Sequence, residues 1–130
     1  MKIRVTGGAG YIGAMLVPML LRRGYRIRVL DNFSWGCKPI LHWAADPKVE
    51  LVSGDVRDEE GVKQALDQQD LVIHLAASVG YPACAADPGR AVSTNVDGTR
   101  NIVKNLAGRT LIFASTGSTY GKVCLLYTSP

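Results

Sequence analysis

The sequence has no long apolar run and no recognisable export signal. None of its 130 residues belongs to a stretch approaching the roughly 18 consecutive apolar residues that a membrane span requires. Met1 is followed almost at once by Ile3 and Val5, without the charged and apolar regions of a signal peptide. These absences predict a protein that works in the cytoplasm and has no membrane partner.

Cysteine is also scarce, and its spacing is uninformative. Cys37, Cys84 and Cys124 form an odd set without the Cys-x-x-Cys spacing of zinc sites. A disulfide framework and a metal site are therefore both disfavoured. Free thiols in a reducing compartment fit this pattern best.

The chain lacks a cluster of basic residues. Its net charge is +4, but lysine and arginine are scattered and aromatic residues make up only 7%. A nucleic-acid surface would need a basic stripe with interleaved aromatics. We therefore expect no nucleic-acid partner and only a mild preference for anionic ligands.

What the chain does contain is an alternation of strand and helix patterns. Short β-branched or apolar runs alternate with segments in which apolar residues recur at helical spacing. Such alternation predicts right-handed βαβ units and an α/β fold with a doubly wound parallel sheet of the Rossmann type, strand order 3-2-1-4-5. Strands are expected over 2–6, 26–31, 49–53, 70–76 and 109–115, helices over 11–23, 58–66 and 88–106, and a short helix over 40–44 within an ambiguous loop.

One residue conflicts with this assignment. Pro18 falls inside the helix expected over 11–23, where an interior proline costs about 3 kcal/mol and removes a backbone hydrogen bond. The apolar stripe still favours a helix, with a bend near 15–18.

The sharpest motif is Thr6-Gly7-Gly8-Ala9-Gly10-Tyr11-Ile12-Gly13, between the first strand and the first helix. A dinucleotide fingerprint has this position and spacing. Gly7 allows a tight turn, Gly10 lets a pyrophosphate approach the backbone, and Gly13 lets the helix pack against the strand. The helix start at Tyr11 and Ile12 would then hold the phosphates.

Asp31 ends the second expected strand and is followed by Asn32. A carboxylate there accepts hydrogen bonds from the adenosine ribose and repels a 2′-phosphate, which favours NAD over NADP. The alternative is that Asp31 and Asn32 only open a turn.

Further motifs make the resemblance specific. The chain resembles the extended short-chain dehydrogenase/reductase family of nucleotide-sugar epimerases and dehydratases over about residues 1–122. Besides the glycine motif and Asp31-Asn32, the matching stretches are Gly54-Asp55-Val56-Arg57-Asp58, His74-Leu75-Ala76-Ala77, Asn95-Val96-Asp97-Gly98-Thr99 and Ser115-Thr116-Gly117-Ser118-Thr119-Tyr120-Gly121.

This resemblance implies further cofactor contacts. Asp55 resembles the aspartate that accepts from the adenine amino group, with Val56 beside the ring, and Asn95 resembles an asparagine that fixes the site beneath the nicotinamide. The small residues at the strand end would let the cofactor ribose lie against the backbone; they are Leu75, Ala76 and Ala77. Without the resemblance, each residue also has a purely structural alternative: Asp55 as a turn residue after a strand, and Asn95 as a residue of local packing.

The resemblance also implies a catalytic set, of which one member is present. Thr116 matches the Ser/Thr position that hydrogen-bonds the reacting oxygen. The family's Tyr-x-x-x-Lys pair is absent, because Tyr120 is followed four positions later by Cys124. Dehydratases carry an acidic pair after the threonine, whereas this chain has Gly117 and Ser118, which favours epimerisation or plain oxidoreduction.

The last residues depart from the family. The stretch 123–130 resembles translated transposase-adapter DNA, so we expect a C-terminally truncated domain over 1–122 and an artificial tail over 123–130. The natural protein should run on into the missing tyrosine and lysine. The strand over 109–115 would then become an unpaired apolar edge.

These features predict the NAD-binding part of a nucleotide-sugar 4-epimerase-like enzyme. We expect the chain as given to be inactive, and the full-length parent to be a homodimer that uses the helix over 88–106. Two alternatives remain open: oxidation or reduction of another alcohol, and a non-catalytic NAD sensor on the same fold.

Overall fold

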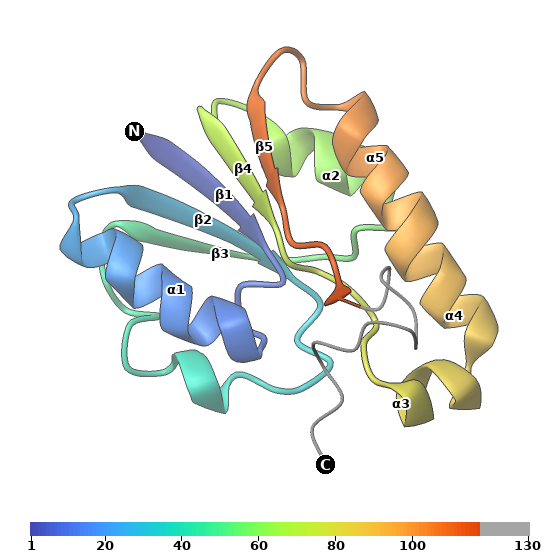
Figure 1. Ribbon diagram of the computed structural model, residues 1–130. Coiled ribbons are helices and arrows are strands. Elements are labelled where there is room, and N and C mark those ends of the chain that lie inside the picture. The colour runs from blue at the N-terminus through green and yellow to red at the C-terminus, as the bar shows by residue number, and fades with distance from the viewer. Residues whose placement is uncertain (118–130) are drawn as a thin grey trace.

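A computed structural model describes residues 1–117 of the chain. A five-stranded parallel sheet has the order β3-β2-β1-β4-β5, which confirms the predicted doubly wound topology (Figure 1). The strands are β1 (Lys2–Thr6), β2 (Arg26–Asp31), β3 (Val49–Ser53), β4 (Leu71–His74) and β5 (Thr110–Phe113). The helices are α1 (Tyr11–Arg22), η1 (Lys38–Ile40), α2 (Glu59–Leu66), α3 (Tyr81–Ala86), α4 (Pro88–Val92), η2 (Ser93–Asp97) and α5 (Gly98–Lys104).

Helices cover both faces of the sheet (Figure 1). On one face α1 packs through Val17 and Leu21 against Ile3 and Val5 of β1. On the other face α2 and α5 pack against β4 through a cluster that includes Val62, Ile102 and Val72. Because side chains alternate along each strand, β2 and β4 contribute to both clusters, whereas β1 contributes only to the first.

Two helical segments differ from the sequence prediction. The stretch after β4, expected to be a loop, contains the short helix α3. The helix expected over 88–106 divides into α4, the π-helical turn η2 and α5. An apolar repeat near 3.6 residues does not reveal a local change to i→i+5 hydrogen bonding, so the π turn left no clear signal in the sequence.

α1 continues through Pro18 as one helix. The stretch after β2 forms η1 and then turns that bury Ile40 and Trp43 against α1. The anticipated short helix is therefore confirmed only in part, at a slightly earlier position.

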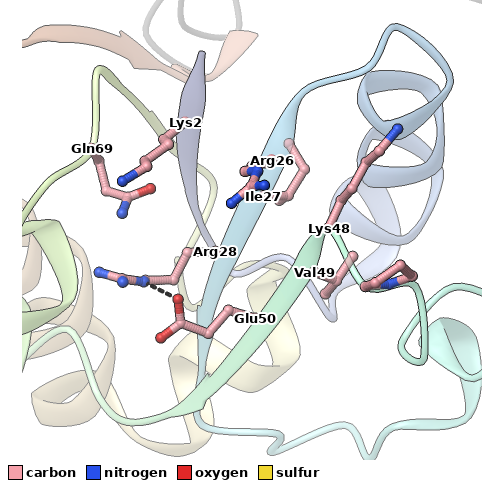
Figure 2. Close-up of a pocket in the computed structure, with 9 residues that line it drawn as sticks. Lys2, Arg26, Ile27, Arg28, Lys48, Val49, Glu50 and Gln69 are labelled. Atoms are coloured by element: carbon pink, nitrogen blue, oxygen red, sulfur yellow. Dashed lines mark hydrogen bonds and ion pairs between the residues drawn. The ribbon is translucent and has the colours of Figure 1, made fainter.

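The amino ends of the strands form a basic hollow of about 240 Å³. Figure 2 shows Lys2, Arg26, Arg28 and Lys48 around it, with Arg28 directed toward Glu50 of the neighbouring strand. Behind it, Arg4 is fully buried and its guanidinium donates to the carbonyl oxygen of Ala65 near the end of α2. The arginines therefore meet the negative end of a helix, an ordinary structural role.

β5 is the outer strand of the sheet within residues 1–117. Its Ile112 and Phe113 are each about half exposed, which agrees with the expected apolar edge. The expected tail over 123–130 lies outside the described residues, as do Ser118, Tyr120 and Cys124.

Candidate cofactor site

The glycine loop is held so tightly against the sheet that two of its glycines have no room for a side chain. Gly7 has a φ of +71°, and a Cβ there would lie 2.6 Å from the backbone nitrogen of Ala76. A Cβ on Gly13 would lie 2.5 Å from the Cα of Gly8. Real Cβ atoms do not approach backbone this closely, so the loop requires glycine at both positions for steric reasons.

The start of α1 is open. Gly10 is the N-cap residue, and no side chain in the described part of the chain caps this helix end with a hydrogen bond. The first backbone N–H groups of a helix have no intrahelical partner, so those of Tyr11, Ile12 and Gly13 are free to bind an anion. Such a helix end also carries about half a positive charge.

Asp31 joins the end of β2 to the glycine loop. Its Oδ2 accepts from the backbone N–H of Ala9 at 2.9 Å, and its Oδ1 accepts from that of Phe33 at 2.8 Å. A carboxylate has about four acceptor positions, so the group can still accept hydrogen bonds from a diol. Asp31 therefore opens the turn, as the turn interpretation expects, and keeps acceptor positions for a ligand.

Asp55 is kept ionised by its neighbour. Its carboxylate accepts from the backbone and the guanidinium of Arg57, with the shortest contact at 2.7 Å. The side-chain hydrogen bonds from Arg57 lower the pKa of Asp55, although partial burial opposes the shift. Asp55 therefore remains an acceptor at the edge of the cleft.

These groups share one cleft of about 820 Å³ at the carboxyl ends of the strands, large enough for a dinucleotide. It is lined by all the residues expected to contact the cofactor except Asn95: Gly7, Gly10, Tyr11, Ile12, Gly13, Asp31, Asn32, Asp55, Val56, Leu75, Ala76 and Ala77. Thr116 lies just after β5, is exposed, and is not among the lining residues.

Other lining residues were not anticipated from the sequence. Ser34, Trp35 and Pro39 line the cleft from the segment after β2, whereas Arg90 and Thr94 line it from α4 and η2. No motif singled them out, because only the topology brings these segments to the same opening.

Asn95 lies beside the cleft and holds one of its walls. Its Oδ1 accepts from the backbone N–H of Ser78 at 2.7 Å, and its Nδ2 donates to the Ser78 carbonyl oxygen at 2.9 Å. The thiol of Cys84 also contacts that carbonyl oxygen, at 3.5 Å. Since Asn95 belongs to η2, the π turn presents an amide that fixes the segment after β4.

His74, the last residue of β4, connects α5 to β1. Thr99 donates its hydroxyl proton to the carbonyl oxygen of Asn95 at 2.7 Å, so its oxygen must accept the Nε2–H of His74, 3.0 Å away. The unprotonated Nδ1 then accepts from the Thr6 hydroxyl at 2.5 Å. Burial lowers the pKa of His74 to about 4, which keeps the ring neutral.

Comparison with known proteins agrees with this geometry. Residues 3–127 match the NAD dependent epimerase/dehydratase family. The chain belongs to that family. Within the family, it is 37% identical over 120 residues to a UDP-N-acetyl-alpha-D-glucosaminuronate decarboxylase of Bacillus cytotoxicus, covering 91% of this chain and 37% of the relative. It is 35% identical over 127 residues to a UDP-glucose 4-epimerase of Lacticaseibacillus casei, covering 94% of this chain and 37% of the relative.

A solved family structure has the same fold. The UDP-glucose 4-epimerase of Thermus thermophilus in complex with NAD superposes with a TM-score of 0.79 at 34% identity, covering 90% of this chain and 38% of that one. The chain therefore spans a little over a third of the length of these family members.

The residues present fit a dinucleotide. The glycine loop leaves no room for side chains at Gly7 and Gly13, the start of α1 is uncapped within the described residues, and an aspartate lies beside each of the strand ends after β2 and β3. None of the helices within residues 1–117 is long and apolar enough to cross a bilayer. In the same part of the chain, no cluster of His, Cys, Asp and Glu is arranged to hold a metal ion.

Proposed function

We propose that this chain forms the NAD-binding part of an enzyme that converts a nucleotide sugar by hydride transfer to and from the cofactor. The observation that carries the proposal is the single cleft shared by the uncapped start of α1, the glycine loop and Asp31. The family relationship supports it, and the named relatives are a decarboxylase and an epimerase of UDP-sugars.

Each lining group has a proposed part in binding. The backbone N–H groups of Tyr11, Ile12 and Gly13 bind the pyrophosphate, with Gly7 and Gly10 leaving it room. Asp31 and Asn32 bind the adenosine ribose. The adenine lies beside Asp55 and Val56, and the strand end formed by Leu75, Ala76 and Ala77 faces the nicotinamide half. Asn95 acts indirectly, since it fixes Ser78 beside that half.

The catalytic part of the proposal depends on residues beyond those described. NAD would supply the hydride acceptor and donor. Thr116 hydrogen-bonds the reacting oxygen, while a tyrosine and a lysine of the full-length parent move the proton. We propose epimerisation as the outcome, and no turnover by the chain as given. A longer DNA read across the codons for Gly121 to Pro130 tests this part: a frame that continues into a Tyr-x-x-x-Lys supports it, and a natural stop codon after Pro130 contradicts it.

Binding of the dinucleotide is the direct test. Titration of the 130-residue chain with NADH, followed by the nicotinamide fluorescence, should show saturable binding that is tighter than binding of NADPH. Asp31→Ala should weaken NADH binding roughly tenfold or more, because it removes charge-assisted acceptors of the ribose, and should abolish the preference over NADPH.

Asp67→Ala is the matched control for this titration. Asp67 is an exposed aspartate that follows α2 and does not line the cleft. The Asp67→Ala substitution should leave the affinities for NADH and NADPH unchanged. Equal NADH affinities of the wild-type chain and Asp31→Ala would contradict the assignment of the ribose acid.

Two further proposals concern the whole protein. A homodimer would bury the apolar side chains that α4, η2 and α5 expose, among them Val92, Val96 and Val103. The cytoplasmic location expected from the sequence stays a prediction.

A further inference from the structure

The cleft has an excess of negative charge for a site that would hold a diphosphate. Three of its lining residues within the described part are aspartates: Asp31, Asp55 and Asp87. A dinucleotide would add the two negative charges of its diphosphate. The start of α1 offers only about half a unit of positive charge, so a full positive charge is needed nearby.

Arg90 is the only lysine or arginine among the described lining residues. The other arginine near the cleft, Arg57, is already paired with Asp55. Within residues 1–117, Arg90 forms no ion pair, and its guanidinium makes a single weak hydrogen bond, from Nη2 to Ser34 Oγ at 3.3 Å. Most of its donors are therefore available to a ligand.

The contact between Arg90 and Ser34 spans the opening of the cleft. Arg90 belongs to α4, where the Asp87 carboxylate accepts its backbone N–H at 2.9 Å and so fixes its place on the helix. Ser34 belongs to the loop after β2, where its hydroxyl donates to Asn32 Oδ1 at 2.6 Å. The guanidinium thus lies between α4 on one wall and the loop that follows the ribose acid on the other.

We propose that Arg90 is a phosphate-binding residue that contacts the diphosphate of the bound dinucleotide and joins the two walls of the cleft across it. This inference rests on the proposed function, since it assumes that a dinucleotide occupies the cleft. The planar guanidinium can bind two phosphate oxygens at once. It also balances the carboxylates that the diphosphate would otherwise meet.

An arginine in this position could also bind two other phosphate groups, and the experiment must distinguish them from the diphosphate of the dinucleotide. A 2′-phosphate on the ribose and the diphosphate of a nucleotide-sugar substrate are both esters that an arginine can bind. The titration therefore uses four probes with the 130-residue chain: NADH, NADPH, UDP, and adenosine, which has no phosphate.

Arg90→Ala should weaken NADH binding roughly tenfold, and Arg90→Lys should recover part of the loss, because lysine keeps the charge but not the bidentate geometry. The salt dependence of NADH binding should become shallower in Arg90→Ala. Adenosine binding should not change. Arg100→Ala is the matched control, because Arg100 is exposed on α5, pairs with Asp97 and does not line the cleft.

The outcomes are distinguishable. Equal NADH affinity in the wild-type chain and Arg90→Ala overturns the inference while leaving the proposed function intact. A loss confined to NADPH or to UDP overturns it in favour of a 2′-phosphate or a substrate phosphate. Absence of NADH binding by the wild-type chain overturns the proposed function and the inference with it. If circular dichroism shows Arg90→Ala to be unfolded, the NADH affinities of Arg90→Gln and Arg90→Lys are compared with that of the wild-type chain instead. Equal affinities again overturn the inference.

Discussion

The indole Nε1–H of Trp43 donates to the backbone carbonyl oxygen of Ala14, 3.3 Å away. That oxygen would ordinarily accept the N–H of the residue four positions later, which is Pro18 and has none. Trp43 is 5% exposed, so the hydrogen bond forms within the core against α1. A side chain from the segment after β2 therefore satisfies the acceptor that the proline leaves free.

This relationship predicts a coupling between Trp43 and Pro18. Trp43→Phe should destabilise the fold by about 2 kcal/mol, because it leaves a buried carbonyl oxygen unsatisfied and reduces packing. In a Pro18→Ala background the same change should be milder by about 1 kcal/mol, because the substituted alanine would supply the missing N–H. Urea denaturation of the four proteins measures the coupling, and strictly additive effects would contradict it.

A second prediction concerns pH. The pKa of His74 is lowered by burial to about 4, from the ordinary 6.5 that the unfolded chain retains. The unfolded state therefore takes up a proton first as the pH falls, so stability declines between pH 6.5 and pH 4 and levels off below that. The shift corresponds to at most about 3 kcal/mol.

Thermal or urea unfolding at several pH values checks this. His74→Gln should be less stable at pH 7, because it loses part of the link between Thr6 and Thr99, but its stability should decline less between pH 6.5 and pH 4. His42→Gln removes an exposed histidine and should keep the wild-type decline. If the stability of His74→Gln declined as steeply with falling pH as that of the wild-type chain, His74 would not be the group that causes the decline.

A third prediction tests the steric role of the glycine loop. Gly13→Ala should lower the stability by several kcal/mol and abolish NADH binding, because its Cβ would lie 2.5 Å from the backbone of Gly8, which is itself packed against Val29. Gly89→Ala is the matched control. There a Cβ would meet only Asp87 Oδ1, at 3.8 Å, so stability and binding should be nearly unchanged. Circular dichroism melting and the NADH titration provide both readouts.

A fourth prediction concerns Arg4. Its side chain is fully buried, and its Nε and Nη1 have no hydrogen-bond partner among residues 1–117. Burial together with the charge of Arg28 lowers its pKa to about 9. Arg4→Met keeps the volume and removes a poorly compensated charge, so it should raise the free energy of unfolding by about 1 kcal/mol. Arg28→Met should instead destabilise the fold, because Arg28 pairs with Glu50 and donates to the Asp67 carbonyl oxygen. A destabilised Arg4→Met in urea denaturation would show that the hydrogen bond to Ala65 outweighs the burial of charge.

Patterns within short stretches account for most of the fold. The strand order, both helical layers and the position of the glycine loop followed from the alternation of apolar runs and helical repeats, because each run reports the face that its own residues bury. The spacing of the glycines and the position of Asp31 after β2 are also local features, so the cleft could be anticipated from the sequence. The lack of room at Gly7, by contrast, comes from the distant backbone of Ala76.

The contacts between residues far apart in the sequence are determined by tertiary packing. Trp43 reaches Ala14, Asn95 holds Ser78, and Arg90 reaches Ser34 across 56 positions of sequence. Hydrogen bonds of this kind depend on how elements lie side by side, and no repeat or motif in either partner encodes the distance between them. Local sequence thus dictates where a cofactor cleft forms, whereas the packing of distant elements dictates which side chains build its walls and where its positive charge lies.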